Sequence, residues 1–223
     1  MIIKYSNTKM STTIIITIFY FVILLFSVIA HELAHGYAAY TLGDPTAKYA
    51  GRLTLNPLKH LDPFGSIILP GLLLLASGGS GPVLGWAKPV PINPYNLKDQ
   101  KWGDVKVAIA GPASNIALAL IFGLLLRFIP AEIFAMAPGM SLMFYYIVQI
   151  NIMLAMFNLL PIPPLDGSWI LFKFLPNSQT FESAKMFLQR YGLMILIFLL
   201  FFGGFSGFYK IISSVVYLIT GIA

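Results

Sequence analysis

The chain of 223 residues contains no cysteine, and only 10% of its residues carry charged side chains. Without cysteine it forms neither disulfides nor thiolate metal sites, so any metal would be held by its 3 histidines or 8 acidic residues. A soluble domain of average composition is about 25% charged and about 45–50% apolar. Because this chain is 58% hydrophobic as well as poor in charge, we expect most of its surface to contact lipid.

The charges that are present favour a membrane over a nucleic acid as partner. Lys and Arg number 14 against 8 Asp and Glu, which gives a net charge of +6. These cations lie in loops beside apolar segments, a placement typical of membrane topology and of contact with anionic lipid headgroups. We therefore expect a lipid bilayer, and no nucleic acid, among the partners.

Four apolar stretches are long enough to cross a bilayer as helices. The first begins at Ser11, and its helical pattern continues to Thr41, a length of about 45 Å. The other predicted spans are 104–129, 141–160 and 191–209. A cleaved signal peptide is an alternative for the first stretch, because Lys4 and Lys9 precede it. Cleavage after Ala30 would however remove the most informative motif in the chain.

The region between the first two spans has a different pattern. Residues 46–57 and 82–94 mix β-formers with Pro and Gly, which predicts short strands or extended loops. The apolar run 64–76 is too short to cross about 30 Å, so we expect a re-entrant or interfacial helix. The tail 210–223 is expected to lie at the membrane interface. The predicted fold is an all-α polytopic membrane protein, a single domain over 1–223, with a small β element on the cytoplasmic side.

Charge placement predicts which side of the membrane each loop faces. If the first span runs from outside to inside, cations are more numerous in the inner loops, in keeping with the positive-inside rule. The inner cations are Lys48, Arg52, Lys59, Lys88, Lys98, Lys101, Lys106, Lys173, Lys185 and Arg190, and the outer ones are Lys4, Lys9, Arg127 and Lys210. This orientation suits a multi-pass protein of the cell membrane.

The first span ends in a metal-binding pattern, His31-Glu32-Leu33-Ala34-His35. Residues i and i+4 share a helix face, so both imidazoles can bind one metal, and Glu32 lies beside them where a general base for water is needed. Two histidines packed against polar neighbours would be the structural alternative. Ionisable groups next to a membrane span are unfavourable and usually functional, so the pattern predicts a metal site.

A catalytic zinc usually has three protein ligands, so a third is needed. Asp166 is the strongest candidate, because Pro161, Pro163 and Pro164 interrupt the helix before it and force extended backbone at membrane depth. Its alternative role is to cap the next helix. The other candidates are His60, Asp44, Asp62, Asp99, Asp104, Glu132 and Glu182. His60 and Asp62 are expected to be solvated or capping loop residues.

Three motifs together resemble the site-2 protease family of intramembrane metalloproteases. They are HELAH at 31–35, the N-x-x-P-x-P-x-x-D-G pattern met at 158–167, and Gly-Pro-Ala-Ser-Asn at 111–115, which resembles that family's G-P-x-x-N. The resemblance covers about residues 14–175, the expected catalytic core. We expect this chain to lack the added peptide-binding or nucleotide-binding domain that many members carry. We therefore expect partner proteins to regulate its activity.

The resemblance also implies roles for individual residues. His31, His35 and Asp166 would bind one Zn²⁺ per chain, with Glu32 as the catalytic base. Asn158 and Asn115 would hydrogen-bond the substrate backbone or the developing oxyanion. The implied activity is hydrolysis of peptide bonds within or near the transmembrane segments of membrane-anchored proteins.

Two other functions are compatible with the metal motif. A membrane protease of another zinc family would use Glu132 or Glu182 as its third ligand and cut loops outside the bilayer. A non-enzymatic metal carrier or pseudoprotease would bind metal without needing Glu32 beside the ligands. Loss of metal on replacing Asp166 would argue against the first, and loss of function on replacing Glu32 would argue against the second.

Overall fold

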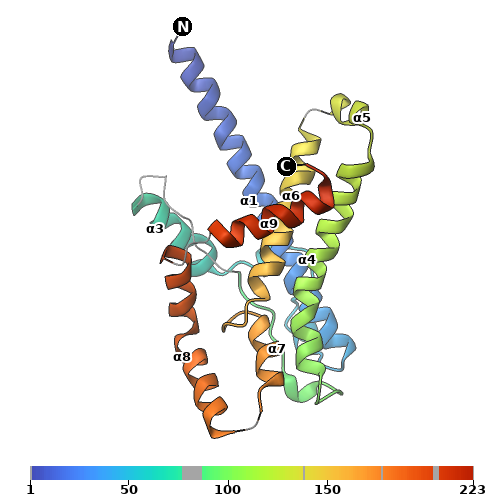
Figure 1. Ribbon diagram of the computed structural model, residues 1–223, viewed down its shortest axis with the longest axis vertical. Helices are drawn as coiled ribbons and strands as arrows, with labels where there is room; N and C mark the ends of the chain where they lie inside the picture. The colour runs from blue at the N-terminus through green and yellow to red at the C-terminus, as the bar shows by residue number, and fades with distance from the viewer. Residues whose placement is uncertain (1, 77–86, 138, 177, 203–205, 223) are drawn as a thin grey trace. The chain divides into compact units, whose positions relative to one another are not determined.

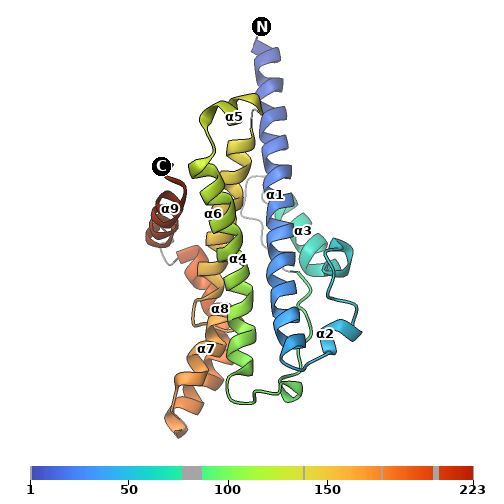
Figure 2. The same cartoon turned by 90° about the vertical axis from the view of Figure 1, so that its right-hand side faces the viewer.

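The computed structural model describes residues 2–76, 87–137, 139–176, 178–202 and 206–222. The chain divides into two compact units. Unit 1 comprises Met1–Ser27 with Pro112–Ala223, and unit 2 comprises Val28–Gly111. Helices α1 (Ile2–Thr41) and α4 (Gly103–Phe128) each contribute residues to both. Figure 2 shows α1 as one unbroken helix in blue.

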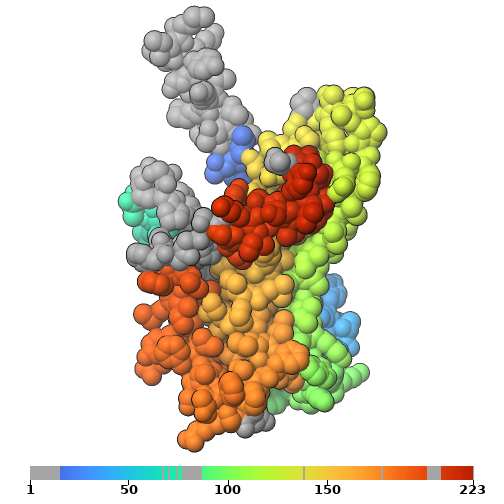
Figure 3. All heavy atoms as spheres, in the orientation of Figure 1, coloured from blue at the N-terminus to red at the C-terminus, as the bar shows by residue number. Residues whose placement is uncertain are grey.

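Unit 1 is built around a three-helix core. Besides parts of α1 and α4, it holds α5 (Ala131–Met136), α6 (Met140–Asn158), α7 (Gly167–Phe174), α8 (Gln179–Phe202) and α9 (Ser206–Thr220). Buried side chains of α4, α6 and α9 form one apolar cluster: Ala119, Val148, Ile152, Ile212 and Val216. Figures 1 and 3 show α9, in red, lying across α6. This packing fixes α6, and α6 leads directly into the proline-rich loop at its C-terminal end.

A polar network also joins three helices of unit 1. Asn115 on α4 and Asn151 on α6 are both fully buried, and the Asn115 amide donates to Asn151 Oδ1 at 2.8 Å. Asn151 in turn donates to Ser27 Oγ on α1 at 2.9 Å. Interhelical hydrogen bonds of this kind stabilise helix association where lipid provides no hydrophobic driving force. The network therefore sets the register of α1, α4 and α6.

Unit 2 combines the last part of α1, from Val28 onward, with short helices and extended chain. It contains α2 (Thr46–Tyr49), η1 (Pro57–Lys59), η2 (Pro63–Ile68), α3 (Leu69–Ala76) and η3 (Pro94–Asn96). Ala39, Leu97 and Val107 form its buried cluster. Through this cluster, extended chain before α4 and the first turns of α4 pack onto α1.

The helices confirm a membrane protein. Within the described residues, three are long and apolar enough to cross a bilayer: Ile16–Thr41, Gly103–Phe128 and Met140–Asn158. The fourth predicted span, 191–209, includes residues 203–205, which lie outside the described part of the chain; its described residues belong to α8 and α9. The tail from 210 belongs to α9, whose apolar face is packed in the core of unit 1.

The loop between α1 and α4 differs from prediction in its local structure. No strand occurs among the residues that the structure describes, and the expected strand-like piece from residue 46 begins instead with helix α2. Residues 82–86 lie outside the described part, whereas 87–93 follow an extended path without regular structure. The expected short apolar helix over 64–76 is present as η2 followed by α3.

Candidate metal centre

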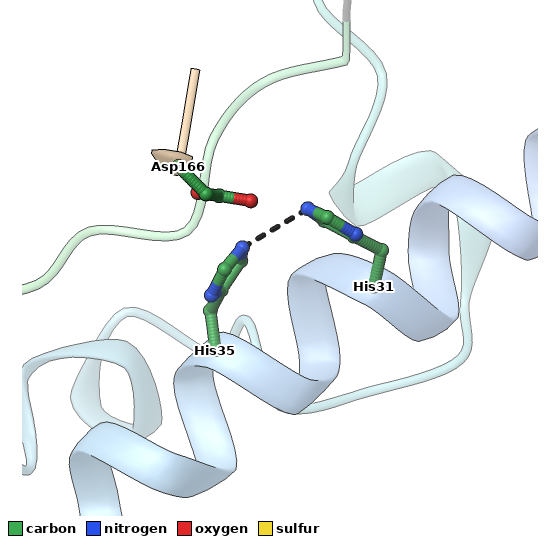
Figure 4. Close-up of side chains that lie close together, drawn as sticks. All are labelled: His31, His35 and Asp166. Atoms are coloured by element: carbon green, nitrogen blue, oxygen red, sulfur yellow. Dashed lines mark hydrogen bonds between the residues drawn. The ribbon is translucent and has the colours of Figure 1, made fainter. Parts of the chain in front are cut away.

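Helix α1 places His31 and His35 side by side, one turn apart. Both side chains are buried, at 5% and 7% exposure. Their Nε2 atoms approach to 3.0 Å, and the two rings meet edge to face (Figure 4). The predicted pairing of residues i and i+4 on one helix face is therefore present, with both nitrogens directed at one point.

A backbone carbonyl fixes the orientation of the His35 ring. Its Nδ1 lies 2.7 Å from the Val107 carbonyl oxygen at the start of α4. When Nδ1 carries the proton and donates it to that oxygen, Nε2 presents its lone pair to a metal. Partners of this kind set the tautomer and ring orientation of metal-binding histidines. The contact prepares His35 as a ligand through Nε2.

Gly111 on α4 leaves the space in which the two imidazoles converge. A Cβ atom at this position would lie 2.3 Å from His35 Nε2 and 2.6 Å from His31 Nε2, closer than atoms can approach. The sequence contained the signal, a Gly-Pro pair inside an apolar helical run. Sequence reasoning connected that motif only with Asn115 and did not predict a role for Gly111.

A tight loop after α6 presents Asp166. Gly167 permits the loop to close, because a Cβ there would lie 2.2 Å from the Leu159 carbonyl oxygen and 2.6 Å from that of Leu160. Asp166 stands just before α7, yet its carboxylate makes no capping hydrogen bond to that helix. The capping role considered as its alternative is therefore not the one that the structure favours.

The described residues contain one group of potential metal ligands, formed by His31, His35 and Asp166. The two histidines belong to unit 2, and Asp166 belongs to unit 1. Zinc binds imidazole nitrogen at about 2.0–2.1 Å and carboxylate oxygen at about 2.0–2.2 Å. Two imidazoles and one carboxylate are a donor set typical of catalytic zinc, which keeps a fourth position open. The residues therefore fit this metal.

Glu32 is held by the extended segment before α4. Its Oε2 accepts a hydrogen bond of 2.8 Å from the backbone N–H of Val90, and the side chain is half-buried. Glu32 follows His31 directly in the motif, the position from which a general base for water is expected to act.

The other carboxylates considered as third ligands have different surroundings. Asp44 is fully buried and accepts hydrogen bonds from Thr46, Asn93 and Asn96. Burial alone would raise the pKa of the Asp44 carboxyl, but these hydrogen bonds outweigh it and hold that pKa below its ordinary value. Glu132 and Glu182 are exposed. None of these carboxylates joins the histidine pair in the described structure.

His60 and Asp62 behave differently from each other. Asp62 caps η2 by accepting from the N–H groups of Phe64 and Gly65, as predicted. His60 is the C-cap residue of η1, as one of its two predicted roles had it, but it is not solvated, because its side chain is fully buried and its Nε2 lies 2.8 Å from the Thr54 carbonyl oxygen. A buried imidazole can satisfy a backbone carbonyl within a loop, which a sequence pattern does not reveal.

The two predicted substrate-contacting asparagines are both engaged within unit 1. Asn158, the last residue of α6, donates from its amide to the Leu154 carbonyl at 3.0 Å. Asn115 belongs to the buried network with Asn151 and Ser27. These contacts show how each side chain is oriented, and contact with substrate stays a prediction for both.

Comparison with known proteins finds relatives named as zinc metalloproteases. A family model described as peptidase family M50 matches residues 19–199. The chain is 42% identical over 180 residues to "Putative zinc metalloprotease YwhC" of Bacillus subtilis, covering 79% of this chain and 77% of that protein. It is 34% identical over 177 residues to "Putative zinc metalloprotease Rip2" of Mycolicibacterium smegmatis, covering 79% of this chain and 64% of that protein. The comparison with solved structures finds no match.

Replacing Gly111 with Ala should weaken metal binding. The new methyl group would occupy the space between the imidazoles and push at least one Nε2 away, so we expect zinc affinity to fall by about 10–100-fold, the range typical when ligand orientation is lost. Metal per chain on purified, monodisperse protein measures the effect. Gly207→Ala on α9 is the matched control, since a Cβ there meets nothing within 4 Å. Unchanged zinc in Gly111→Ala would mean that the imidazoles do not converge below this glycine.

Proposed function

The chain belongs to peptidase family M50, and from this membership and its metal-ligand set we infer that it is an intramembrane zinc metalloprotease. The observation that carries this inference is the buried imidazole pair with Glu32 beside it on α1. Its apolar helices make it a membrane protein, so its substrates are membrane-embedded proteins. A purely metal-carrying function is disfavoured, because transport alone gives no reason for a carboxylate held next to the ligands.

We propose that His31 and His35, through their Nε2 atoms, and Asp166, through its carboxylate, hold the zinc ion. When bound, zinc supplies a Lewis acid that polarises the scissile carbonyl and makes water a usable nucleophile near neutral pH. Other groups of the chain orient these ligands. The Val107 carbonyl holds the His35 ring, and the closed loop before Gly167 holds Asp166.

Glu32 is the proposed general base. Its carboxylate takes a proton from the attacking water as the oxygen adds to the scissile carbonyl carbon, and it can return that proton to the amine nitrogen as the C–N bond breaks. The hydrogen bond from Val90 occupies Oε2 and restrains the side chain during this exchange. Asn158 and Asn115 are proposed to hydrogen-bond the substrate backbone or the developing oxyanion, which for Asn115 requires its amide to leave the buried network.

A substrate helix must unwind before its carbonyls become accessible. We propose that the unwound stretch is held as an added strand along 48–55, whose first two residues end α2, or along 86–92, of which the structure describes 87–92. In this structure the second segment is held next to Glu32, where a substrate strand would be close to the reacting groups. The pairing would create, on binding, the small β element that the sequence analysis expected.

The membrane arrangement is proposed from charge placement. The site would face the cytoplasm in the cell membrane, with part of α8 as a fourth span and η2 with α3 as a re-entrant or interfacial insertion. That insertion covers Pro63–Ala76, and at about 1.5 Å per residue it is shorter than the hydrocarbon core. We also propose that partner proteins regulate the proteolytic activity.

Replacing Glu32 with Gln should abolish proteolysis while zinc is retained. Glutamine keeps the shape of the side chain and can still accept the Val90 hydrogen bond, but it is not a base, so the rate should fall by about 10²–10⁴. Cleavage of a single-span membrane protein in detergent measures it, with zinc per chain determined in parallel. Glu182→Gln, at an exposed carboxylate, is the control. Substantial residual cleavage by purified Glu32→Gln would contradict the assignment.

Asp166→Ala should lower zinc occupancy together with activity, whereas Asn158→Ala should lower activity with zinc retained. Loss of the carboxylate leaves two imidazoles around a dication, while an amide can only orient substrate or donate to an oxyanion, a contribution of about 2.7–4 kcal/mol when one such donor is removed. Elemental analysis and cleavage of one substrate separate the two. Full zinc in Asp166→Ala would direct the search to Glu132, Glu182 and His60.

Single cysteines should report the proposed orientation. The native chain has none, so Lys98→Cys and Lys185→Cys should be protected from an impermeant thiol reagent in intact cells, and Ala137→Cys should be labelled. Labelling after membrane permeabilisation confirms that the protected sites are reactive. Modification of position 98 from outside would reverse the topology and remove the support for a re-entrant η2 and α3.

A further inference from the structure

Arg52 is a buried cation whose position the metal chemistry does not explain. Its side chain is only 6% exposed, although charge placement predicted a loop cation facing the inner surface. Moving a guanidinium out of water is unfavourable unless its N–H groups are satisfied. Here Nη1 and Nη2 donate to three backbone carbonyls, those of Lys59, Lys88 and Pro89, the last at 3.1 Å. Arg52 therefore joins two loop segments that are far apart in sequence.

The second of these segments is held on both sides. The Lys88 N–H donates to the His60 carbonyl at 2.9 Å, while Arg52 binds the Lys88 and Pro89 carbonyls. Pro89 and Pro91 flank Val90 and restrict the backbone further, since proline fixes its own φ and limits the residue before it. The backbone around Val90 is therefore held rigidly, although it belongs to no strand or helix.

This rigid backbone ends at the proposed general base. The Val90 N–H donates to Glu32 Oε2 at 2.8 Å. The Val90 side chain is buried and faces α1 at Gly36, where a Cβ atom would lie 3.1 Å from Val90 Cγ1. Val90 thus contacts α1 through both its backbone and its side chain, at Glu32 and Gly36, the residues that directly follow His31 and His35. Every residue in this chain of contacts belongs to unit 2.

We propose that Arg52 is a positioning residue for catalysis: it fixes the backbone of residues 88–90, whose N–H at Val90 holds the Glu32 carboxylate for proton transfer. This inference rests on the proposed function. A carboxylate on a helix can rotate about its side-chain bonds, and one fixed donor selects the rotamer that faces the reacting water. A misplacement of about 1 Å by a distant change can lower a rate about 10²-fold, so loosening this backbone should reduce kcat.

The test compares Arg52→Ala and Arg52→Lys with Lys101→Ala, an exposed cation of the same unit. In Arg52→Ala we expect kcat to fall by about 10–100-fold with zinc per chain near the wild-type value. Arg52→Lys should recover part of kcat, because an ammonium group can still donate to the carbonyls. Lys101→Ala should retain wild-type kcat. The measurement is steady-state cleavage of one detergent-solubilised membrane substrate by monodisperse protein.

A second pair of variants keeps the proposal testable if Arg52→Ala does not fold. Val90→Pro removes the N–H that Glu32 accepts from, whereas Val90→Ala removes side-chain packing and keeps the N–H. We expect the larger kcat loss in Val90→Pro. If Arg52→Ala folds, the double variant Arg52→Ala/Val90→Pro should have a kcat only slightly below that of either single variant. Both substitutions act through the same hydrogen bond, from the Val90 N–H to Glu32.

The outcomes separate this inference from the proposed function. Full kcat in folded Arg52→Ala or Val90→Pro, with Glu32→Gln inactive, would overturn the positioning role and leave the protease assignment intact. A rise in KM at unchanged kcat would also overturn it, because the segment would then serve substrate binding alone. Activity in Glu32→Gln would overturn both proposals.

Discussion

The convergence of the His31 and His35 Nε2 atoms, 3.0 Å apart in a buried position, is the constraint on which the rest of the structure depends. Two imidazoles on adjacent turns of a helix do not stay in this arrangement unaided. The Val107 carbonyl orients one ring, and the missing side chain of Gly111 leaves the space in front of both. The start of α4 is therefore as much a part of the metal centre as α1.

Polar groups elsewhere in the chain follow the same physical rule. In a protein with few charges and a lipid-facing surface, a buried polar group is tolerated when it is hydrogen-bonded. Asn115, Asn151 and Ser27 satisfy one another between helices, Asp44 holds the turn after α1, and Arg52 binds backbone carbonyls in place of a strand ladder. Each of these side chains supplies hydrogen bonds where helix or strand pairing of the backbone does not supply them.

The loop between α1 and α4 links this rule to the chemistry. Its prolines prevent a regular strand or long helix, so its backbone groups are satisfied by side chains of other segments. One of them, the Val90 N–H, is satisfied by the carboxylate proposed as general base. One hydrogen bond thus gives the Val90 N–H its partner and also orients the proposed general base. In this way an extended segment without regular structure can contribute to catalysis.

The sequence by itself determined the membrane class, the long apolar helices and the pairing of His31 with His35, because hydropathy and the i, i+4 spacing of these residues are local properties of one helix. It also singled out Asp166, through prolines that no helix could continue past. The boundaries of the last helices, the burial of His60 and the roles of Gly111 and Arg52 were decided only by tertiary structure. These depend on which distant carbonyl, ring or empty space each residue meets, and such contacts leave no periodic trace along the chain.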